Sequence, residues 1–207
     1  MKKTYFAIIS GGLAVAVVVM GGSRLLAQVG RTGSSRIPLS SLAGSFAGES
    51  NSNFRICFNQ DFTAAQSCSR TPQSQIVQYV EHSKNHVTVD TKGGSCGEVV
   101  GISAPVPPGR LGTAVNNYIA VGVTTSYNPD TRSGDVSYEF YIAGPGVTCK
   151  GATFVNTADA PVRFTETAYF MVSENISRFD VFVLTFHMIT GVDYLSGLVA
   201  HGFALRQ

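Results

Sequence analysis

The residues best placed to do chemistry in this sequence are two carboxylates that lie among aromatic residues. Glu139 occurs in Ser-Tyr-Glu-Phe-Tyr, and Glu166 occurs in Phe-Thr-Glu-Thr-Ala-Tyr. A glutamate that faces an apolar interior needs a partner, because an unpaired buried charge is costly. Such a group would orient the polar end of a ligand or serve acid–base chemistry. The alternative is that both carboxylates face water on the outer pleat of their strands.

The four histidines add two further pairs of candidate groups. His82 and His86 flank the tip of an expected hairpin, but a zinc site requires three or four protein ligands, so we interpret them as solvated turn residues. His187 and His201 lie in the last two apolar segments. We interpret both as buried histidines with satisfied hydrogen bonds, and we keep His187 as a candidate for a ligand pocket.

The motifs of common enzyme families are incomplete. The segment Gly101-Ile102-Ser103-Ala104-Pro105 lacks the second glycine and the helix of a serine-hydrolase elbow. The segment Lys92-Gly93-Gly94-Ser95 has the residues of a phosphate loop in the wrong order. We therefore predict no catalytic residue, no metal site and no cofactor, and we favour a non-enzymatic role.

All four cysteines, Cys57, Cys68, Cys96 and Cys149, lie after the apolar N-terminal segment. An even number of cysteines in an exported chain favours two disulfide bonds, for which three pairings exist. We favour Cys57–Cys68, which closes a short polar excursion, together with Cys96–Cys149, which joins distant strands. No two cysteines have the Cys-x-x-Cys spacing that is common in zinc sites, so disulfides are the preferred interpretation.

The first 27 residues have the pattern of a secretory signal peptide. Lys2 and Lys3 precede an uncharged run from Tyr5 to Met20, and we expect cleavage after Ala27. An uncleaved anchor helix is the alternative, but the run is shorter than the ~20 residues of a membrane span. We therefore predict a secreted or periplasmic protein with no stable membrane anchor after signal cleavage.

Composition supports an exported, β-rich domain and argues against some partners. Charged residues make up only 14% of the chain, which argues against a charge-rich disordered protein. Signal cleavage would remove three basic residues and no acid, so the net charge would fall from +2 to −1. Because no basic block stands out, we expect no nucleic-acid partner. Residues 28–41 are rich in Gly and Ser and predict a flexible linker before a single domain over 42–207.

From Leu42 onward, alternating apolar residues and turn signals predict an all-β domain. A short helix is expected only within Asp61–Ser69, where Asp61 would act as the N-terminal cap. Eight to ten strands with mostly short connections indicate an antiparallel up-and-down meander, closed into a barrel because closure removes the sheet edges. The expected strands are 42–50, 76–81, 86–90, 96–102, 118–127, 136–143, 151–156, 162–173, 179–190 and 194–205, with turns at 82–85 and 191–193.

The expected strand 179–190 is mainly apolar on both faces. One face would line the barrel, and the other would meet a partner subunit or a covering segment, which favours a homo-oligomer. The other interpretation is a sandwich strand with ordinary exposed hydrophobic residues. By strict alternation one face carries Phe179, Val181, Val183, Thr185 and His187, and the other carries Asp180, Phe182, Leu184, Phe186 and Met188.

Several segments, spread over residues 42–50 and 115–207, carry a family resemblance. They are Leu42-Ala43-Gly44-Ser45-Phe46, a Gly-Asp turn that leads to aromatic strands, the strand 151–154 after Cys149, Tyr169-Phe170-Met171-Val172, the strand 179–188, and the terminal Ser196-Gly197 with Gly202-Phe203-Ala204-Leu205-Arg206-Gln207. Together they resemble a group of small exported bacterial proteins with one meandering barrel. The resemblance implies a calycin-like fold and supplies no catalytic residue. The chain departs from true lipocalins, because Phe46 stands where their Gly-x-Trp motif has tryptophan and the sequence contains no Trp.

Three functions fit these features. We favour a non-enzymatic barrel that binds a small hydrophobic ligand in its interior. The alternatives are an envelope module that forms oligomers, and an isomerase or cyclase that acts on an apolar substrate inside the barrel. In the alternative without a ligand, the aromatic residues of the predicted pocket simply fill the core of the barrel. The predicted pocket residues are Tyr138, Phe140, Phe154, Phe164, Glu166, Tyr169, Phe170, Phe182, Phe186 and His187.

Overall fold

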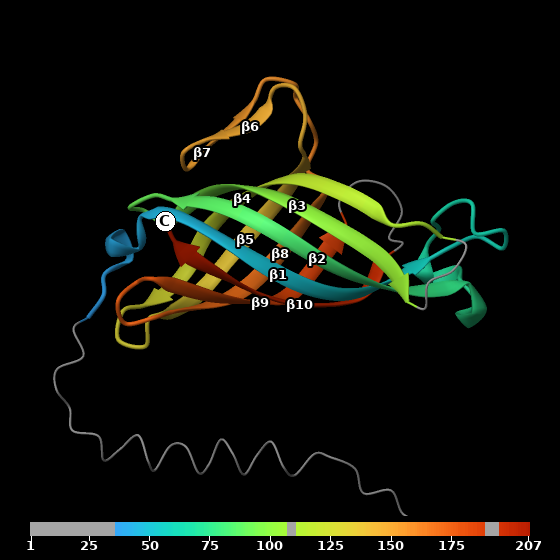
Figure 1. The fold of residues 1–207 in the computed structure, drawn as a ribbon, viewed down its shortest axis with the longest axis horizontal. Helices are drawn as coiled ribbons and strands as arrows, with labels where there is room; N and C mark the ends of the chain where they lie inside the picture. The colour runs from blue at the N-terminus through green and yellow to red at the C-terminus, as the bar shows by residue number, and fades with distance from the viewer. Residues whose placement is uncertain (1–35, 107–110, 189–194) are drawn as a thin grey trace, which may run out of the picture. The chain divides into compact units, whose positions relative to one another are not determined.

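The computed structural model describes residues 36–106, 111–188 and 195–207. The predicted signal peptide, the first part of the expected linker and the expected turn at 191–193 lie outside these residues. Within the described ranges the chain is all-β, as predicted, and eight strands close into one antiparallel barrel (Figure 1). No helix in these ranges has the length and hydropathy needed to cross a membrane.

The barrel is an up-and-down meander with one insertion. Each strand pairs with the next, except that β6 and β7 form a separate hairpin between β5 and β8. Strand β1 pairs with both β2 and β10, and this pairing closes the barrel. The architecture is consistent with a calycin-like fold. The elements are η1 (Leu39–Leu42), β1 (Gly44–Cys57), η2 (Cys68–Arg70), η3 (Gln73–Gln75), β2 (Ile76–Val89), β3 (Gly94–Val106), β4 (Ala114–Asn128), β5 (Ser133–Ile142), β6 (Val147–Lys150), β7 (Thr153–Asn156), β8 (Phe164–Val172), β9 (Arg178–Met188) and β10 (Leu195–Arg206).

Strand β2 is longer than the sequence suggests. The expected turn at 82–85 is wrong, because β2 continues through these residues and joins two expected strands into one. Polar residues are tolerated here because one face of the strand meets a polar interior, where the buried Ser83 places its Oγ 3.1 Å from Ser50 Oγ. The turn comes later, where the Asp90 carboxylate accepts backbone hydrogen bonds and Gly93 adopts a φ of 85°.

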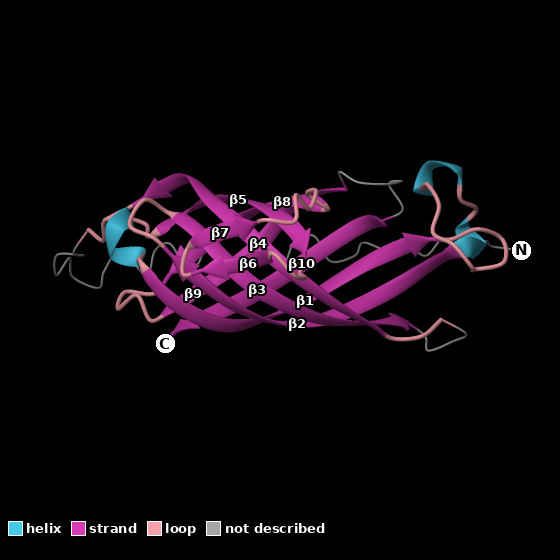
Figure 2. Cartoon of the chain, turned by 90° about the horizontal axis from the view of Figure 1, so that it is seen from above, coloured by secondary structure: helices cyan, strands magenta, loops and turns pink. Residues whose placement is uncertain are grey.

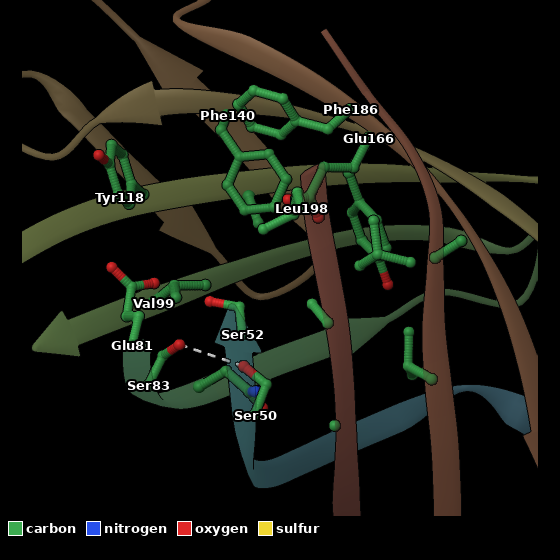
Figure 3. Close-up of a pocket in the computed structure, with 18 of the residues that line it drawn as sticks. Ser50, Ser52, Glu81, Ser83, Val99, Tyr118, Phe140, Glu166, Phe186 and Leu198 are labelled. Carbon is green, nitrogen blue, oxygen red and sulfur yellow. Dashed lines mark hydrogen bonds between the residues drawn. The ribbon is translucent and has the colours of Figure 1, made fainter. Parts of the chain in front are cut away.

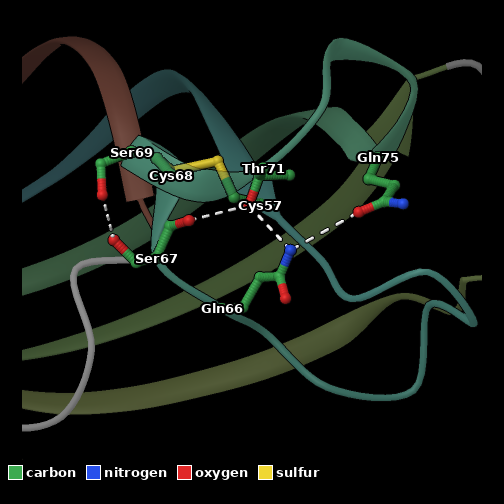
Figure 4. The surroundings of a disulfide bond; sticks show 7 residues. All are labelled: Cys57, Gln66, Ser67, Cys68, Ser69, Thr71 and Gln75. Atoms are coloured by element: carbon green, nitrogen blue, oxygen red, sulfur yellow. Dashed lines mark hydrogen bonds between the residues drawn. A yellow bond between two sulfur atoms is a disulfide. The ribbon is translucent and has the colours of Figure 1, made fainter.

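A disulfide-closed loop follows β1, and the helix predicted there is wrong. Residues 61–69 contain no α-helix. The side-chain oxygen of Asn59, rather than Asp61, organises the loop by accepting two backbone hydrogen bonds at 2.8 and 3.2 Å. The predicted Cys57–Cys68 bond is present, and η2 and η3 lie beside it (Figure 4).

The β6–β7 hairpin lies on the outside of the barrel, against β3 and β4 (Figures 1 and 2). It covers a second apolar cluster, in which Ile119, Tyr141 and Val147 are buried. The rings of Tyr141 and Phe154 lie 4.4 Å apart in this cluster. The predicted Cys96–Cys149 bond is also present and fastens the hairpin to β3. The inserted hairpin therefore explains why the outer face of β4 carries the apolar residues Ile119 and Val121.

Residues that precede β1 cap one end of the barrel. The sequence predicts a flexible linker over residues 28–41, but Ile37 within that range is only 7% exposed. Together with Leu42, which is 1% exposed, it packs against inward side chains of β5 and β8. The Tyr127 hydroxyl donates a 3.0 Å hydrogen bond to the Ile37 carbonyl oxygen. Arg36 and Asp130 form an ion pair at 2.8 Å. The folded unit therefore includes the chain from Arg36 onward.

Candidate functional site

The barrel encloses a cavity of about 380 Å³. Inward side chains from all eight barrel strands line it, since alternate residues of a strand point to the same face. The cavity extends from Leu42 at the capped end to Ile56 and Met188 toward the opposite end. The aromatic residues therefore do not fill the interior, and the space that remains suits a small molecule.

One wall of the cavity is aromatic. Phe140 of β5 stacks on Phe164 of β8, with ring centroids 4.4 Å apart. Phe186 of β9 and Tyr118 of β4 pack against the same Phe164 ring, at 5.0 and 5.2 Å. Such rings present a large and rigid apolar surface at little entropic cost.

The facing wall, formed by β1 to β4, carries most of the polar side chains of the cavity, among apolar ones. Figure 3 shows its serines and Glu81 across the cavity from Phe140 and Phe186. Ser50 and Ser83 lie within hydrogen-bond distance of one another. A molecule in the cavity would therefore contact aromatic rings on one side and hydrogen-bonding groups on the other. The polar side chains of this wall include Ser50, Ser52, Glu81, Ser83, Asn85, Ser95, Ser103 and Asn116.

Glu81 is the acidic group of the polar wall. Its Oε2 accepts a 2.8 Å hydrogen bond from Asn116 Nδ2, which also donates to Ser103 Oγ at 3.2 Å. The carboxyl group fits here because Gly101 has no side chain: a Cβ at Gly101 would lie 2.7 Å from the carboxyl carbon. Burial raises the pKa of Glu81, while hydrogen bonds from Asn116 and Ser83 oppose that shift.

A second carboxyl group enters the cavity from the aromatic side. Glu166 of β8 lies opposite Tyr138 of β5 and opposite Phe186 of β9 in the sheet. Its carboxyl group accepts no hydrogen bond from the residues that the structure describes. Burial, together with the negative charge of Glu81, raises the pKa of Glu166 to about 8. Glu166 is therefore mostly protonated at neutral pH.

Tyr138 completes the polar groups on the aromatic side. Its ring lies over Gly122 of β4, where a Cβ would come within 2.5 Å of a ring carbon. Burial and the charge of Glu166 raise the pKa of Tyr138 to about 12. The phenol therefore keeps its proton at physiological pH and offers a hydrogen-bond donor next to Glu166.

The barrel brings six of the ten predicted pocket residues into the cavity. They come from β5, β8 and β9, the strands that carry Phe140, Phe164 and Phe186 of the aromatic wall. The other four predicted residues lie outside the barrel. The six that line the cavity are Tyr138, Phe140, Phe164, Glu166, Phe170 and Phe186.

Phe182 and His187 face outward because β9 contains a β-bulge. The register of β9 against β8 shifts after Thr167, which leaves Leu184 as an extra residue. The bulge reverses the alternation of side chains along the strand. Phe186 therefore faces the cavity, whereas Phe182 is 40% exposed on the outer surface and His187 is exposed as well.

Three other candidates also lie outside the barrel. Phe154 belongs to β7 and packs on Tyr141 beneath the hairpin. Tyr169 follows the alternation of β8 to the outer face, between two residues that face inward. Glu139 is exposed and accepts a 2.7 Å hydrogen bond from the Tyr141 hydroxyl. Only one of the two carboxylates first singled out, Glu166, therefore reaches the cavity.

The histidines are not buried, in contrast to our interpretation of two of them. His201 is exposed and stacks on Phe182 with ring centroids 4.6 Å apart. His82 Nδ1 lies 3.0 Å from the side-chain oxygen of Asn51 on the outer surface. Within the described residues, no three His, Cys, Asp or Glu side chains are grouped so as to hold a metal ion.

Glu81 and Asn116 line the cavity, although neither is among the predicted pocket residues. The predicted strand 76–81 ends at Glu81, but the alternation Tyr79, Glu81, Ser83 continues through the expected turn. That alternation is the signal that would have placed Glu81 on an inward face. Asn116 carried no comparable signal, because its role depends on the pairing of β3 with β4.

Comparisons of the chain with family models, with curated proteins and with solved structures found no match. The two disulfide bonds indicate an oxidising environment outside the cytoplasm. The function is therefore inferred from the cavity and its two carboxyl groups.

Proposed function

We propose that this protein is a non-enzymatic, secreted or periplasmic carrier that binds one small, largely apolar ligand inside the barrel. The observation that supports this proposal is the cavity of about 380 Å³ with an aromatic wall and a polar wall. The apolar part of the ligand packs against Phe140, Phe164 and Phe186. Its polar end meets the hydrogen-bonding groups around Glu81 and Asn116.

The proposal follows from the energetics of the two walls. Transfer of apolar surface from water to the aromatic wall contributes about 0.8 kcal/mol for each buried methylene. The polar wall offsets the cost of taking one polar group out of water, because buried polar groups are stable only when hydrogen-bonded. A ligand with an apolar body and a single polar end satisfies both walls.

Binding of prodan, an uncharged naphthalene fluorophore, tests the proposal. We expect saturable binding of one prodan per barrel, with a blue shift of its emission. The variant Ala200→Phe places a ring in the cavity and should weaken binding by about tenfold or more. The matched control is Val199→Phe, because Val199 is the next residue on β10, is 68% exposed and points to solvent.

The carrier proposal fails if prodan shows no saturable binding. It also fails if Ala200→Phe and Val199→Phe weaken binding equally, since the site would then not be inside the barrel. Thermal unfolding of both variants checks that each has kept its fold.

One observation favours a second candidate, an isomerase or cyclase acting on an apolar substrate. Glu166 faces the cavity beside Tyr138, and its pKa of about 8 is close to neutral pH, where a general acid or base is most effective. Such an acid–base group in an apolar cavity transfers a proton to or from the carbon atom next to a carbonyl group of the substrate.

Deuterium exchange distinguishes this candidate from the carrier. A long-chain methyl ketone is incubated with the protein in heavy water, and NMR follows its α-protons. An enzyme would exchange these protons faster than buffer and faster than Glu166→Gln. A carrier would bind the ketone without accelerating the exchange.

A further inference from the structure

Two carboxyl groups face one cavity from its two walls. Glu81 projects from β2 on the polar side and Glu166 from β8 on the aromatic side (Figure 3). They are close enough for the charge of Glu81 to raise the pKa of Glu166. Two ionised carboxylates in an apolar interior are costly, so one of them keeps its proton unless a cation compensates the charge.

The protein itself supplies little compensation among its described residues. Asn116 and Ser83 hydrogen-bond to Glu81 but carry no charge. Arg163 and His201 also line the cavity, but neither lowers the pKa of Glu81 or of Glu166. Tyr79 and Tyr138, which line the cavity, are neutral at physiological pH because burial raises their pKa values. The site between the two glutamates is therefore acidic.

We propose that the polar end of the ligand is an amine, which binds as its ammonium cation between Glu81 and Glu166. The inference rests on the proposed function, because it requires a ligand in the cavity. It goes further by assigning the chemical class of that ligand, a hydrophobic amine.

The groups around the two glutamates suit an ammonium ion. Its N–H groups require acceptors, and the glutamate oxygens and the hydroxyl groups of Ser50 and Ser83 provide them. Aromatic faces on the other side attract a cation through their π electrons. A carboxylate in the same place would be repelled by Glu81. A neutral alcohol would bind without compensating the acidic charge.

Binding of an ammonium ion also has a defined proton balance. In the empty cavity at neutral pH, Glu166 carries a proton because its pKa is about 8. The cation stabilises the ionised form of Glu166, so the proton passes to the buffer. No bond other than this O–H bond breaks, and the amine keeps its own proton. We expect the release of about one proton per ligand at pH 7.

Decylamine, decanol and decanoate test the inference, because they share one tail and differ in the polar end. Each competes with prodan at pH 7, and calorimetry in buffers of different ionisation enthalpy measures proton release. We expect decylamine to bind at least about tenfold more tightly than decanol, with decanoate the weakest. Glu81→Gln and Glu166→Gln should each reduce this preference, and Glu166→Gln should also abolish proton release.

Glu139→Gln is the matched control, because Glu139 lies next to Tyr138 on β5 but faces solvent. It should keep both the preference for decylamine and the proton release. If the three decyl compounds bind equally well, or if decanoate binds best, the amine inference is wrong while the carrier function stands. If neither prodan nor any decyl compound binds, the carrier function is wrong and the inference falls with it.

Discussion

At the scale of single residues, the position of Glu166 has the largest consequence. It is the residue of β8 that breaks an otherwise apolar inward face, among Phe164, Ala168 and Phe170. A carboxyl group there is uncharged over most of the physiological range, since burial and Glu81 raise its pKa to about 8. The folded protein therefore binds this proton more tightly than the unfolded chain, and Glu166 reduces stability as the pH rises.

The pH dependence of stability is predicted from the direction of this shift. The ordinary pKa of the group is 4.5, and the folded value is about 8. Below pH 4.5 Glu166 is protonated in both the folded and the unfolded state. Between pH 4.5 and about pH 8 the unfolded chain loses this proton while the folded protein keeps it, so the free energy of unfolding falls progressively as the pH rises. Glu166→Gln should therefore stabilise the protein by a few kcal/mol more at about pH 8 than at about pH 5.

Urea unfolding of wild type and Glu166→Gln at several pH values measures this difference. Glu139→Gln should show no comparable trend, because Glu139 is exposed. A constant difference between wild type and Glu166→Gln across the range would show that the carboxyl group is not held in the apolar environment described above.

At the scale of elements, two strands and the cap explain how the cavity is formed. Strand β2 continues through 82–85, which adds Ser83 to the polar wall. The bulge at Leu184 in β9 turns Phe186 inward and leaves Phe182 outside. The η1 segment closes one end with Leu42. The first two features depend on where the regular alternation of side chains along a strand continues or shifts.

The cap yields a prediction about stability. Leu42 is 1% exposed at the end of the cavity, and Leu42→Ala removes its packing against β5 and β8. We expect a loss of about 2–5 kcal/mol, as for other buried leucines. Ser40→Ala is the control, because Ser40 lies in the same 3-10 turn but is exposed. Equal unfolding curves for the two variants would contradict the proposed role of the cap.

At the scale of the whole molecule, the barrel has apolar clusters on both sides of its wall. The inner cluster involves the cap and the inward residues, and the outer one lies under the β6–β7 hairpin. The Cys96–Cys149 bond joins the hairpin to β3 and spans 53 residues, whereas Cys57–Cys68 spans 11. The longer bond therefore restricts the unfolded chain more strongly.

Removal of each disulfide in turn tests this difference. In the chain-entropy account, loss of Cys96–Cys149 costs about 4 kcal/mol and loss of Cys57–Cys68 about 3 kcal/mol. The first variant should lose more because it also frees the hairpin that covers Ile119 and Tyr141. Chemical unfolding of the two double alanine variants compares them. A larger loss for the Cys57–Cys68 variant would show that the hairpin contributes little to stability.

Local pattern determined much of this protein before any tertiary contact was known. Alternating apolar residues and turn signals were enough for the all-β meander, because side chains alternate along any strand whatever its partner. The even number of cysteines predicted two disulfide bonds, and of the three possible pairings the structure contains the favoured one. Of the aromatic residues predicted for the pocket on β5 and β8, Tyr138, Phe140, Phe164 and Phe170 line the cavity, because both strands alternate regularly, whereas Tyr169 lies on the outer face.

Only the tertiary structure decided which polar groups share the cavity. Glu81 and Glu166 are 85 positions apart, and they meet only because the sheet closes through β1 and β10. The bulge in β9 and the reach of β2 through a polar stretch depend on pairing with neighbouring strands. Long-range pairing sets the register of a strand, and a shift by one residue moves every later side chain to the opposite face.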